Sequence, residues 1–221
     1  MRTVIFDLDG TLADTGDDLI AAANATFAGH GFGSPLDPVA DKATAFGGGR
    51  AMLRLGYSRL GRDAGEDQIS ADYPVLIDHY ARDIDRHTRL YPRAEAAVTG
   101  LRDAGYAVGI CTNKPTALAE DLMRRLGVRD LFASLVGAGS FPVSKPDPAP
   151  YVASVERAGG KVIDSVLIGD TMTDRKTAAA AGVPCVLVAF GPNGRAVEAM
   201  QPEGLLDHYD DLQAVVAGLL G

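Results

Sequence analysis

The 221-residue sequence has few cysteines and an excess of negative charge. Its two cysteines, Cys111 and Cys185, lie in apolar runs and lack the spacing of a metal site, so we expect buried free thiols in a reducing cytoplasm. The formal net charge of -8 speaks against binding to nucleic acid or to an anionic membrane, because both require a basic face. No apolar run approaches the length of a membrane span, and Asp7 interrupts the N-terminal run, unlike a secretory signal.

The chain also lacks an internal repeat, a coiled-coil pattern and a low-complexity tail. Its four histidines have neither metal-ligand nor catalytic-triad spacing: His30, His79, His87 and His208. What is present is 47% hydrophobic and 23% charged residues, the composition of a globular protein. The length suits one core domain with a smaller insertion.

Two regions of the sequence differ in periodicity. Residues 16–89 show no strand pattern, and we expect helices there at 17–30, 35–46, 51–60 and 69–84, the last with Pro74 in its first turn. From residue 90 onward, helical segments alternate with short apolar runs at 106–111, 135–136, 165–168 and 185–189. This alternation implies an α/β fold with right-handed crossovers, a doubly wound, Rossmann-like parallel sheet. We therefore expect a core of residues 1–15 plus 90–221 and an inserted all-helical domain of residues 16–89.

The N-terminal run places two aspartates directly after a predicted strand. Residues 3–6 are apolar or β-branched, which is typical of a buried strand, and Asp7 and Asp9 follow. Residues i and i+2 of an extended chain point to the same side, so both carboxylates face one small volume. Like charges this close require a cation or a shared proton. The alternative is an Asp-Gly turn of a hairpin, but helical periodicity follows Thr15. The run therefore indicates a metal-assisted carboxylate nucleophile.

Polar residues follow the other predicted strands as well, namely Thr112 with Asn113, Lys145, and Asp170 with Asp174. In doubly wound sheets, ligands bind beyond the carboxyl ends of the strands, so we expect these side chains to gather there. Converging carboxylates need a hard cation, and a set of oxygen donors favours Mg²⁺. Lys145 and Thr112 would then meet the far side of an anionic group. This layout suits phosphoryl transfer, in which positioning and charge neutralisation provide most of the catalysis.

Taken together and in this order, the motifs resemble those of the haloacid dehalogenase superfamily. They are Asp-Leu-Asp-Gly-Thr-Leu-Ala-Asp-Thr at 7–15, Thr112 after an apolar strand, Lys145 in Ser-Lys-Pro-Asp-Pro, and Gly169-Asp170 with Asp174. The helical insertion after the first motif resembles the C1 cap of that family, which closes over the site and helps to select the substrate. Within the superfamily, the segments at 47–49, 111–115 and 190–193 most resemble bacterial phosphoglycolate phosphatases.

The resemblance implies a role for each motif residue. Asp7 would be the nucleophile that forms an aspartyl-phosphate, and Asp9 would protonate the leaving alcohol and then activate water. Mg²⁺ would be held by Asp7, the Asp9 backbone carbonyl and Asp170, with Asp174 in an outer role. The phosphoryl oxygens would be held by Thr112, Asn113 and Lys145.

The expected substrate is a small anionic phosphorylated metabolite, with 2-phosphoglycolate favoured. The alternatives are a sugar phosphate, a nucleotide or pyrophosphate, or a non-catalytic phosphate-binding protein of the same fold. Arg50, after the three glycines of the insertion, is a hypothetical partner for a substrate carboxylate. We expect no nucleic-acid or membrane partner, a cytoplasmic location, and a monomer or a homodimer.

Overall fold

The chain folds into two compact units in the computed structural model, which describes residues 1–221. The core unit consists of Met1–Asp14 and Leu90–Gly221, and the cap unit consists of Thr15–Arg89. The chain passes between them through two short strands, β2 (Ala13–Asp14) and β3 (Arg89–Leu90), which form a two-stranded sheet. None of the helices has the length and hydrophobicity needed to cross a bilayer.

The core unit is built on a six-stranded sheet with the strand order β5-β4-β1-β6-β7-β8. All five strand pairs are parallel, and β1 lies between β4 and β6, with Val4 in register with both Val108 and Val166. Every residue of β1 is buried, as expected for a strand covered on both faces. The strands are β1 (Thr3–Phe6), β4 (Ala107–Pro115), β5 (Ser134–Ala138), β6 (Ser165–Gly169), β7 (Cys185–Val188) and β8 (Gly204–Leu206).

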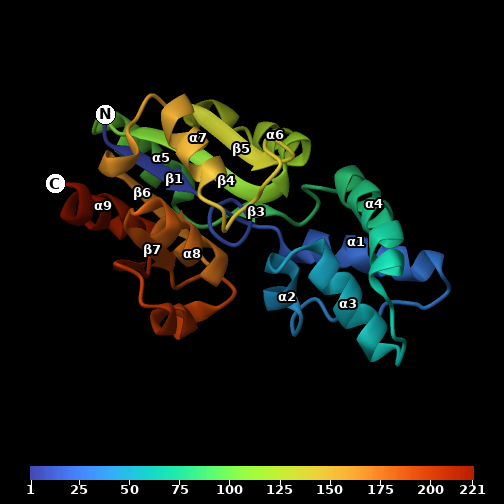
Figure 1. The fold of residues 1–221 in the computed structure, drawn as a ribbon. Coiled ribbons are helices and arrows are strands. Elements are labelled where there is room, and N and C mark those ends of the chain that lie inside the picture. Colours follow the sequence, from blue (N-terminus) through green and yellow to red (C-terminus); the bar gives the residue numbers. More distant parts are fainter. The chain divides into compact units, whose positions relative to one another are not determined.

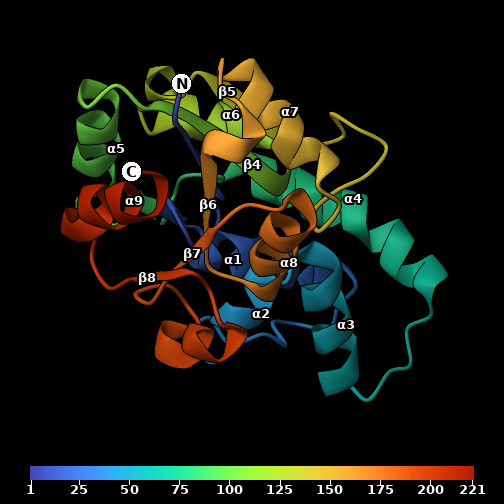
Figure 2. The same ribbon diagram turned by 60° about the vertical axis from the view of Figure 1, so that its left-hand side comes forward.

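Helices cover both faces of this sheet (Figures 1 and 2). Successive residues of β1 point to opposite faces: Ile5 packs in a cluster with Tyr151 and Ala178, whereas the Phe6 ring contacts Phe132 at a centroid distance of 6.3 Å. On one face, α7 and α8 contact each other, and on the other, α5 and α9 do so. The helices are α5 (Ala94–Asp103), α6 (Thr116–Arg125), α7 (Ala149–Arg157), α8 (Met172–Ala181) and α9 (Leu212–Leu220). The predicted doubly wound α/β fold is thus confirmed.

Helices are the regular elements of the cap unit, apart from its last residue, Arg89, which belongs to β3. Its helices are α1 (Gly16–Gly29), α2 (Lys42–Phe46), α3 (Gly49–Arg59) and α4 (Glu66–Arg82). The apolar stripes of α1, α3 and α4 meet in one buried cluster that includes Phe27, Leu53 and Leu76. Gly56 permits the close packing of α3 on α1, because a Cβ atom there would lie 2.3 Å from the Phe27 ring.

Two of the helices expected in the insertion differ from those observed. Pro74 lies in the middle of α4, not in its first turn, because the helix begins at Glu66 in a polar segment that carries no apolar stripe. The helix expected at 35–46 forms only over Lys42–Phe46. The preceding residues form a turn instead, in which the Asp37 carboxylate accepts the backbone N–H groups of Val39 and Ala40.

Candidate active site

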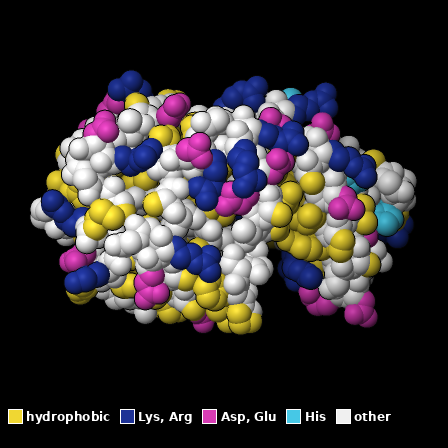
Figure 3. All heavy atoms as spheres, turned by 90° about the horizontal axis from the view of Figure 1, so that it is seen from above, with side chains coloured by type: hydrophobic (Ala, Val, Ile, Leu, Met, Phe, Trp, Pro, Cys, Tyr) yellow, Lys and Arg dark blue, Asp and Glu magenta, His cyan; other side chains and the backbone are white.

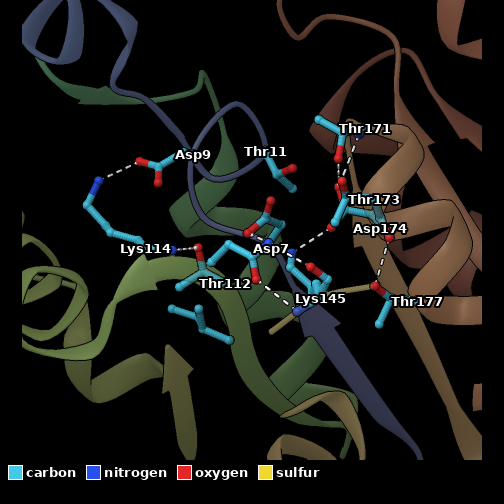
Figure 4. A network of polar contacts seen from close by, with 12 residues as sticks. Asp7, Asp9, Thr11, Thr112, Lys114, Lys145, Thr171, Thr173, Asp174 and Thr177 are labelled. Atoms are coloured by element: carbon cyan, nitrogen blue, oxygen red, sulfur yellow. Dashed lines mark hydrogen bonds and ion pairs between the residues drawn. The ribbon is translucent and has the colours of Figure 1, made fainter. Parts of the chain in front are cut away.

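The polar residues expected at the carboxyl ends of the strands do lie together there (Figure 4). Asp7 follows β1, Thr112 lies in β4, and Asp170 follows β6. Because β1 pairs with both β4 and β6, these three residues lie just beyond the last paired positions of neighbouring strands, at the same edge of the sheet. The register of the parallel sheet thus brings Asp7 together with two residues that lie more than a hundred positions after it in the sequence.

Three carboxylates form the centre of the site. Asp7, Asp170 and Asp174 are buried, and each offers one oxygen such that the three atoms lie within 4.8 Å of one another. Oδ2 of Asp170 is buried and has no hydrogen-bond partner, and Oδ1 of Asp7 has only an ion-pair contact with Lys145 that lacks hydrogen-bond geometry. Buried oxygens left in this state are costly unless a cation meets them. The residues present therefore fit a divalent cation with oxygen ligands.

Lys145 is the one cation held against this cluster. Its Nζ atom lies 2.6 Å from Oδ1 of Asp174 and 3.0 Å from Oδ1 of Asp7, and its side chain is only 2% exposed. The side chain of Asn113 fixes the backbone of Lys145 from both sides: Nδ2 donates to the carbonyl at 2.9 Å, and Oδ1 accepts the N–H at 2.9 Å. The contact of Asn113 with a phosphoryl oxygen stays a prediction, since both ends of its amide are engaged here.

Asp174 lies in the first turn of α8, where its carboxylate is oriented toward Lys145. Its Oδ2 atom accepts hydrogen bonds from the Thr171 hydroxyl at 2.6 Å and from the Thr171 backbone N–H at 3.1 Å. The bond from the backbone N–H is one of the two bonds of the capping box with which the helix begins. Gly169 makes room for Asp174, because a Cβ atom at that position would lie 2.4 Å from the Asp174 side chain. Its other oxygen faces Lys145, so an outer position at a metal site suits Asp174.

The charges of the cluster move the pKa values of its members in opposite directions. Burial raises the pKa of Asp7 to about 6; Lys145 opposes this, while the negative charges of Asp174 and Asp9 add to it. Burial, together with Asp174 and Asp7, raises the pKa of Asp170 well above its usual range. Burial would also raise the pKa of Asp174, but the charge and hydrogen bond of Lys145 outweigh burial and lower it. Burial would lower the pKa of Lys145, but Asp174 and Asp7 raise it. The positive charge of Lys145 thus offsets the effect of burial on the pKa of Asp174, but not on the pKa values of Asp7 and Asp170.

The carboxylate of Asp9 is held by a residue that we did not predict for the site. Nζ of Lys114 donates to Oδ1 of Asp9 at 2.8 Å, and the Lys114 side chain is 3% exposed. Lys114 lies two residues after Thr112 in β4, and the Thr112 hydroxyl accepts its backbone N–H at 3.2 Å. The i, i+2 spacing from a predicted site residue is the signal that would have identified it.

Arg50 lies in the cap unit at the start of α3, where its side chain contacts α4. The guanidinium group donates to Oγ of Ser70 at 3.2 Å, lies 3.9 Å from Glu66, and stacks 5.2 Å from the centroid of the Tyr73 ring. Its role toward a substrate carboxylate stays a prediction. On the face drawn in Figure 3, basic and acidic side chains are interspersed over the surface.

Comparison with known proteins identifies the class. Residues 1–182 match the model of the haloacid dehalogenase-like hydrolase family. The chain belongs to this family of hydrolases, which confirms the resemblance drawn from its motifs.

Among curated relatives, phosphoglycolate phosphatase of Mesorhizobium japonicum is 33% identical over 214 residues, covering 97% of this chain and 94% of the relative. Phosphoglycolate phosphatase of Cereibacter sphaeroides is 34% identical over 221 residues, covering both chains completely.

Solved structures show the same fold. A crystal structure of a predicted phosphoglycolate phosphatase from Haemophilus somnus has a TM-score of 0.82 at 22% identity and covers 97% of each chain. CbbY from Rhodobacter sphaeroides in complex with phosphate has a TM-score of 0.79 at 21% identity and covers 99% of each chain.

Proposed function

We propose that this chain is a Mg²⁺-dependent phosphatase that hydrolyses 2-phosphoglycolate to glycolate and phosphate. The observation that carries this proposal is the buried cluster of Asp7, Asp170 and Asp174 with Lys145, in which two carboxylate oxygens lack a hydrogen-bond partner. The full-length similarity to curated phosphoglycolate phosphatases supports the choice of substrate. The two buried free thiols, Cys111 and Cys185, support a cytoplasmic location.

In this proposal Asp7 attacks phosphorus with one carboxylate oxygen, and the glycolate oxygen leaves. Asp9 donates a proton to that leaving oxygen, and then accepts a proton from the water that hydrolyses the aspartyl-phosphate. Lys145 and Thr112 hold the phosphoryl oxygens, one as a charge and the other as a hydroxyl donor. Lys114 keeps the Asp9 carboxylate in place beside them.

The metal would be held by Asp7, the backbone carbonyl of Asp9 and Asp170, with Asp174 behind them. Bound Mg²⁺ neutralises negative charge on the carboxylates and on the phosphoryl group. The raised pKa values of Asp7 and Asp170 follow from burial together with negative neighbours, which is the condition that a divalent cation relieves.

A substrate panel tests the proposal. The purified chain is assayed for phosphate release from 2-phosphoglycolate, a sugar phosphate, a nucleoside monophosphate and pyrophosphate, with Mg²⁺ and with a chelator. We expect the highest kcat/KM for 2-phosphoglycolate and loss of activity with the chelator. A higher kcat/KM for another ester would change the substrate and leave the chemistry intact. Equal activity with the chelator, or no activity on any phosphate, would contradict the proposed function itself.

A further inference from the structure

The C-terminal part of the core unit reaches back to the loop that follows Asp7. Tyr209, the first residue of η4 (Tyr209–Asp211), donates its hydroxyl to the backbone carbonyl of Thr11 at 2.8 Å, across 198 positions of the sequence. The Tyr209 side chain is 1% exposed, and its ring lies 5.1 Å from that of Phe190. A buried tyrosine with one hydrogen bond of this kind fixes the position of its acceptor.

The side chain of Thr11 connects this hydrogen bond to the carboxylate cluster. Its hydroxyl donates to Oδ1 of Asp170 at 3.0 Å, and Thr11 is completely buried. The bond engages one carboxylate oxygen of Asp170 and leaves the other, Oδ2, without a hydrogen-bond partner. Oδ2 is therefore the oxygen that Asp170 presents to a cation, and the rotation of the carboxylate is set by Thr11.

A second contact from the same region holds the backbone of Asp170. Nδ2 of Asn193 donates to the Asp170 carbonyl at 3.1 Å. Gly191 lies against both loops, since a Cβ atom there would lie 2.8 Å from the Gly10 carbonyl oxygen and 3.5 Å from Cβ of Asp170. The segment after β7 thus contacts the loop after β1 and the loop after β6 at the same place.

We propose that Tyr209 and Asn193 are positioning residues for the metal site: Tyr209 acts through Thr11 on the carboxylate of Asp170, and Asn193 acts on its backbone. This inference rests on the proposed function, because it takes Asp170 as a metal ligand. Neither residue contacts the reacting atoms, so their contribution is to cation affinity. Groups that hydrogen-bond to metal ligands typically affect metal affinity about 10- to 100-fold.

The test compares two tyrosines of the same unit. Tyr151 is also fully buried and shares a single side-chain hydrogen bond, at 2.7 Å with Oγ of Ser165. Isothermal titration of the metal-free, full-length chain with Mg²⁺ alone gives the dissociation constant for wild type, Tyr209→Phe and Tyr151→Phe. We expect an increase of about tenfold for Tyr209→Phe and a change within about twofold for Tyr151→Phe. If both variants weaken binding equally, or neither does, the inference is overturned.

Variants of Thr11 show whether Tyr209 acts through this residue. Thr11→Ser keeps the hydroxyl and should bind Mg²⁺ nearly as wild type, whereas Thr11→Val removes it and should bind about 10-fold or more weakly. The Thr11→Val, Tyr209→Phe double variant should bind no more weakly than Thr11→Val alone, because the two changes break one path. Additive losses would refute this path.

If Tyr209→Phe does not fold, Asn193→Ala tests the same inference, because Asn193 is only half-buried and its replacement disturbs the core less. An affinity at least about threefold weaker supports the inference, and an unchanged affinity overturns it. A wild-type chain that binds no Mg²⁺ would overturn the proposed cofactor together with this inference. Unchanged binding by the variants of a chain that does bind Mg²⁺ would overturn the inference alone.

Discussion

Replacing Asp7, the proposed nucleophile, with its neutral isostere Asn should make the metal-free protein more stable. In the absence of metal, burial and the neighbouring carboxylates disfavour the charged form of Asp7 and raise its pKa from 3.8 to about 6. Asn has nearly the same shape but no charge, so Asp7→Asn removes the cost of burying the charge and the repulsion with Asp174 and Asp9. Lys145 keeps its contact with Asp174.

The size and the pH range of this effect follow from the shift. A rise from 3.8 to about 6 corresponds to roughly 3 kcal/mol, at 1.36 kcal/mol per pKa unit. Because the pKa of a carboxyl group is raised on folding, the folded state binds more protons than the unfolded state between these two values. The wild type is therefore penalised fully above about pH 6 and not at all below about pH 3.8. The difference in the free energy of unfolding between Asp7→Asn and wild type should have the same dependence on pH.

Urea unfolding followed by circular dichroism, in chelator, measures the difference at about pH 7.5 and about pH 4. We expect Asp7→Asn to exceed the wild type by up to about 3 kcal/mol at the higher pH and by less than about 1 kcal/mol at the lower. Asp130→Asn, at an exposed position of the same unit, is the control and should change stability by less than about 0.5 kcal/mol. An Asp7→Asn variant that is less stable than wild type at the higher pH, or equally favoured at both pH values, would refute the reasoning.

Three further predictions concern the charges of the site. Lys145→Gln leaves the buried carboxylates without their cation. The free energy of unfolding without metal should therefore fall by about 3–5 kcal/mol. An unchanged urea-unfolding curve would contradict this prediction. Lys114→Met releases the carboxylate of Asp9. This variant should lower kcat about 100-fold with little change in KM, as expected for impaired general acid–base catalysis. A change in KM alone would argue for a substrate-binding role of Lys114. Mg²⁺ affinity, measured by calorimetry, should fall as the pH drops below about 6, because metal binding must displace the proton of Asp7. An affinity that is independent of pH between about 5 and 7.5 would contradict the raised pKa of Asp7.

Much of the core unit follows from local sequence. The apolar runs of β1, β4 and β6 are short and continuous, as in buried parallel strands, and the parallel order brings the residues that follow them to one edge. The sequence therefore suffices to predict that Asp7, Thr112 and Asp170 lie near each other. The start of α8 at Met172 also has a local cause, the capping box of Thr171 and Asp174.

Other features depend on side-chain geometry that no local pattern encodes. The pairing of Lys114 with Asp9 depends on the rotamers of two side chains, one from β4 and one from the loop after β1. The bond from Tyr209 to Thr11 joins residues 198 positions apart and has no signal in either neighbourhood. Pro74 lies inside α4 because the packing of Leu76 and Ile69 in the cap unit outweighs the local penalty for proline in a helix.

The proposed mechanism requires that Asp7 be phosphorylated during turnover. Acid quenching of the full-length chain during the hydrolysis of 2-phosphoglycolate with Mg²⁺, followed by peptide mass spectrometry, locates the phosphoryl group directly. We expect the phosphoryl group on Asp7 in wild type and on no residue in Asp7→Asn. A phosphoryl group on another side chain, or turnover that persists in Asp7→Asn, would contradict the account.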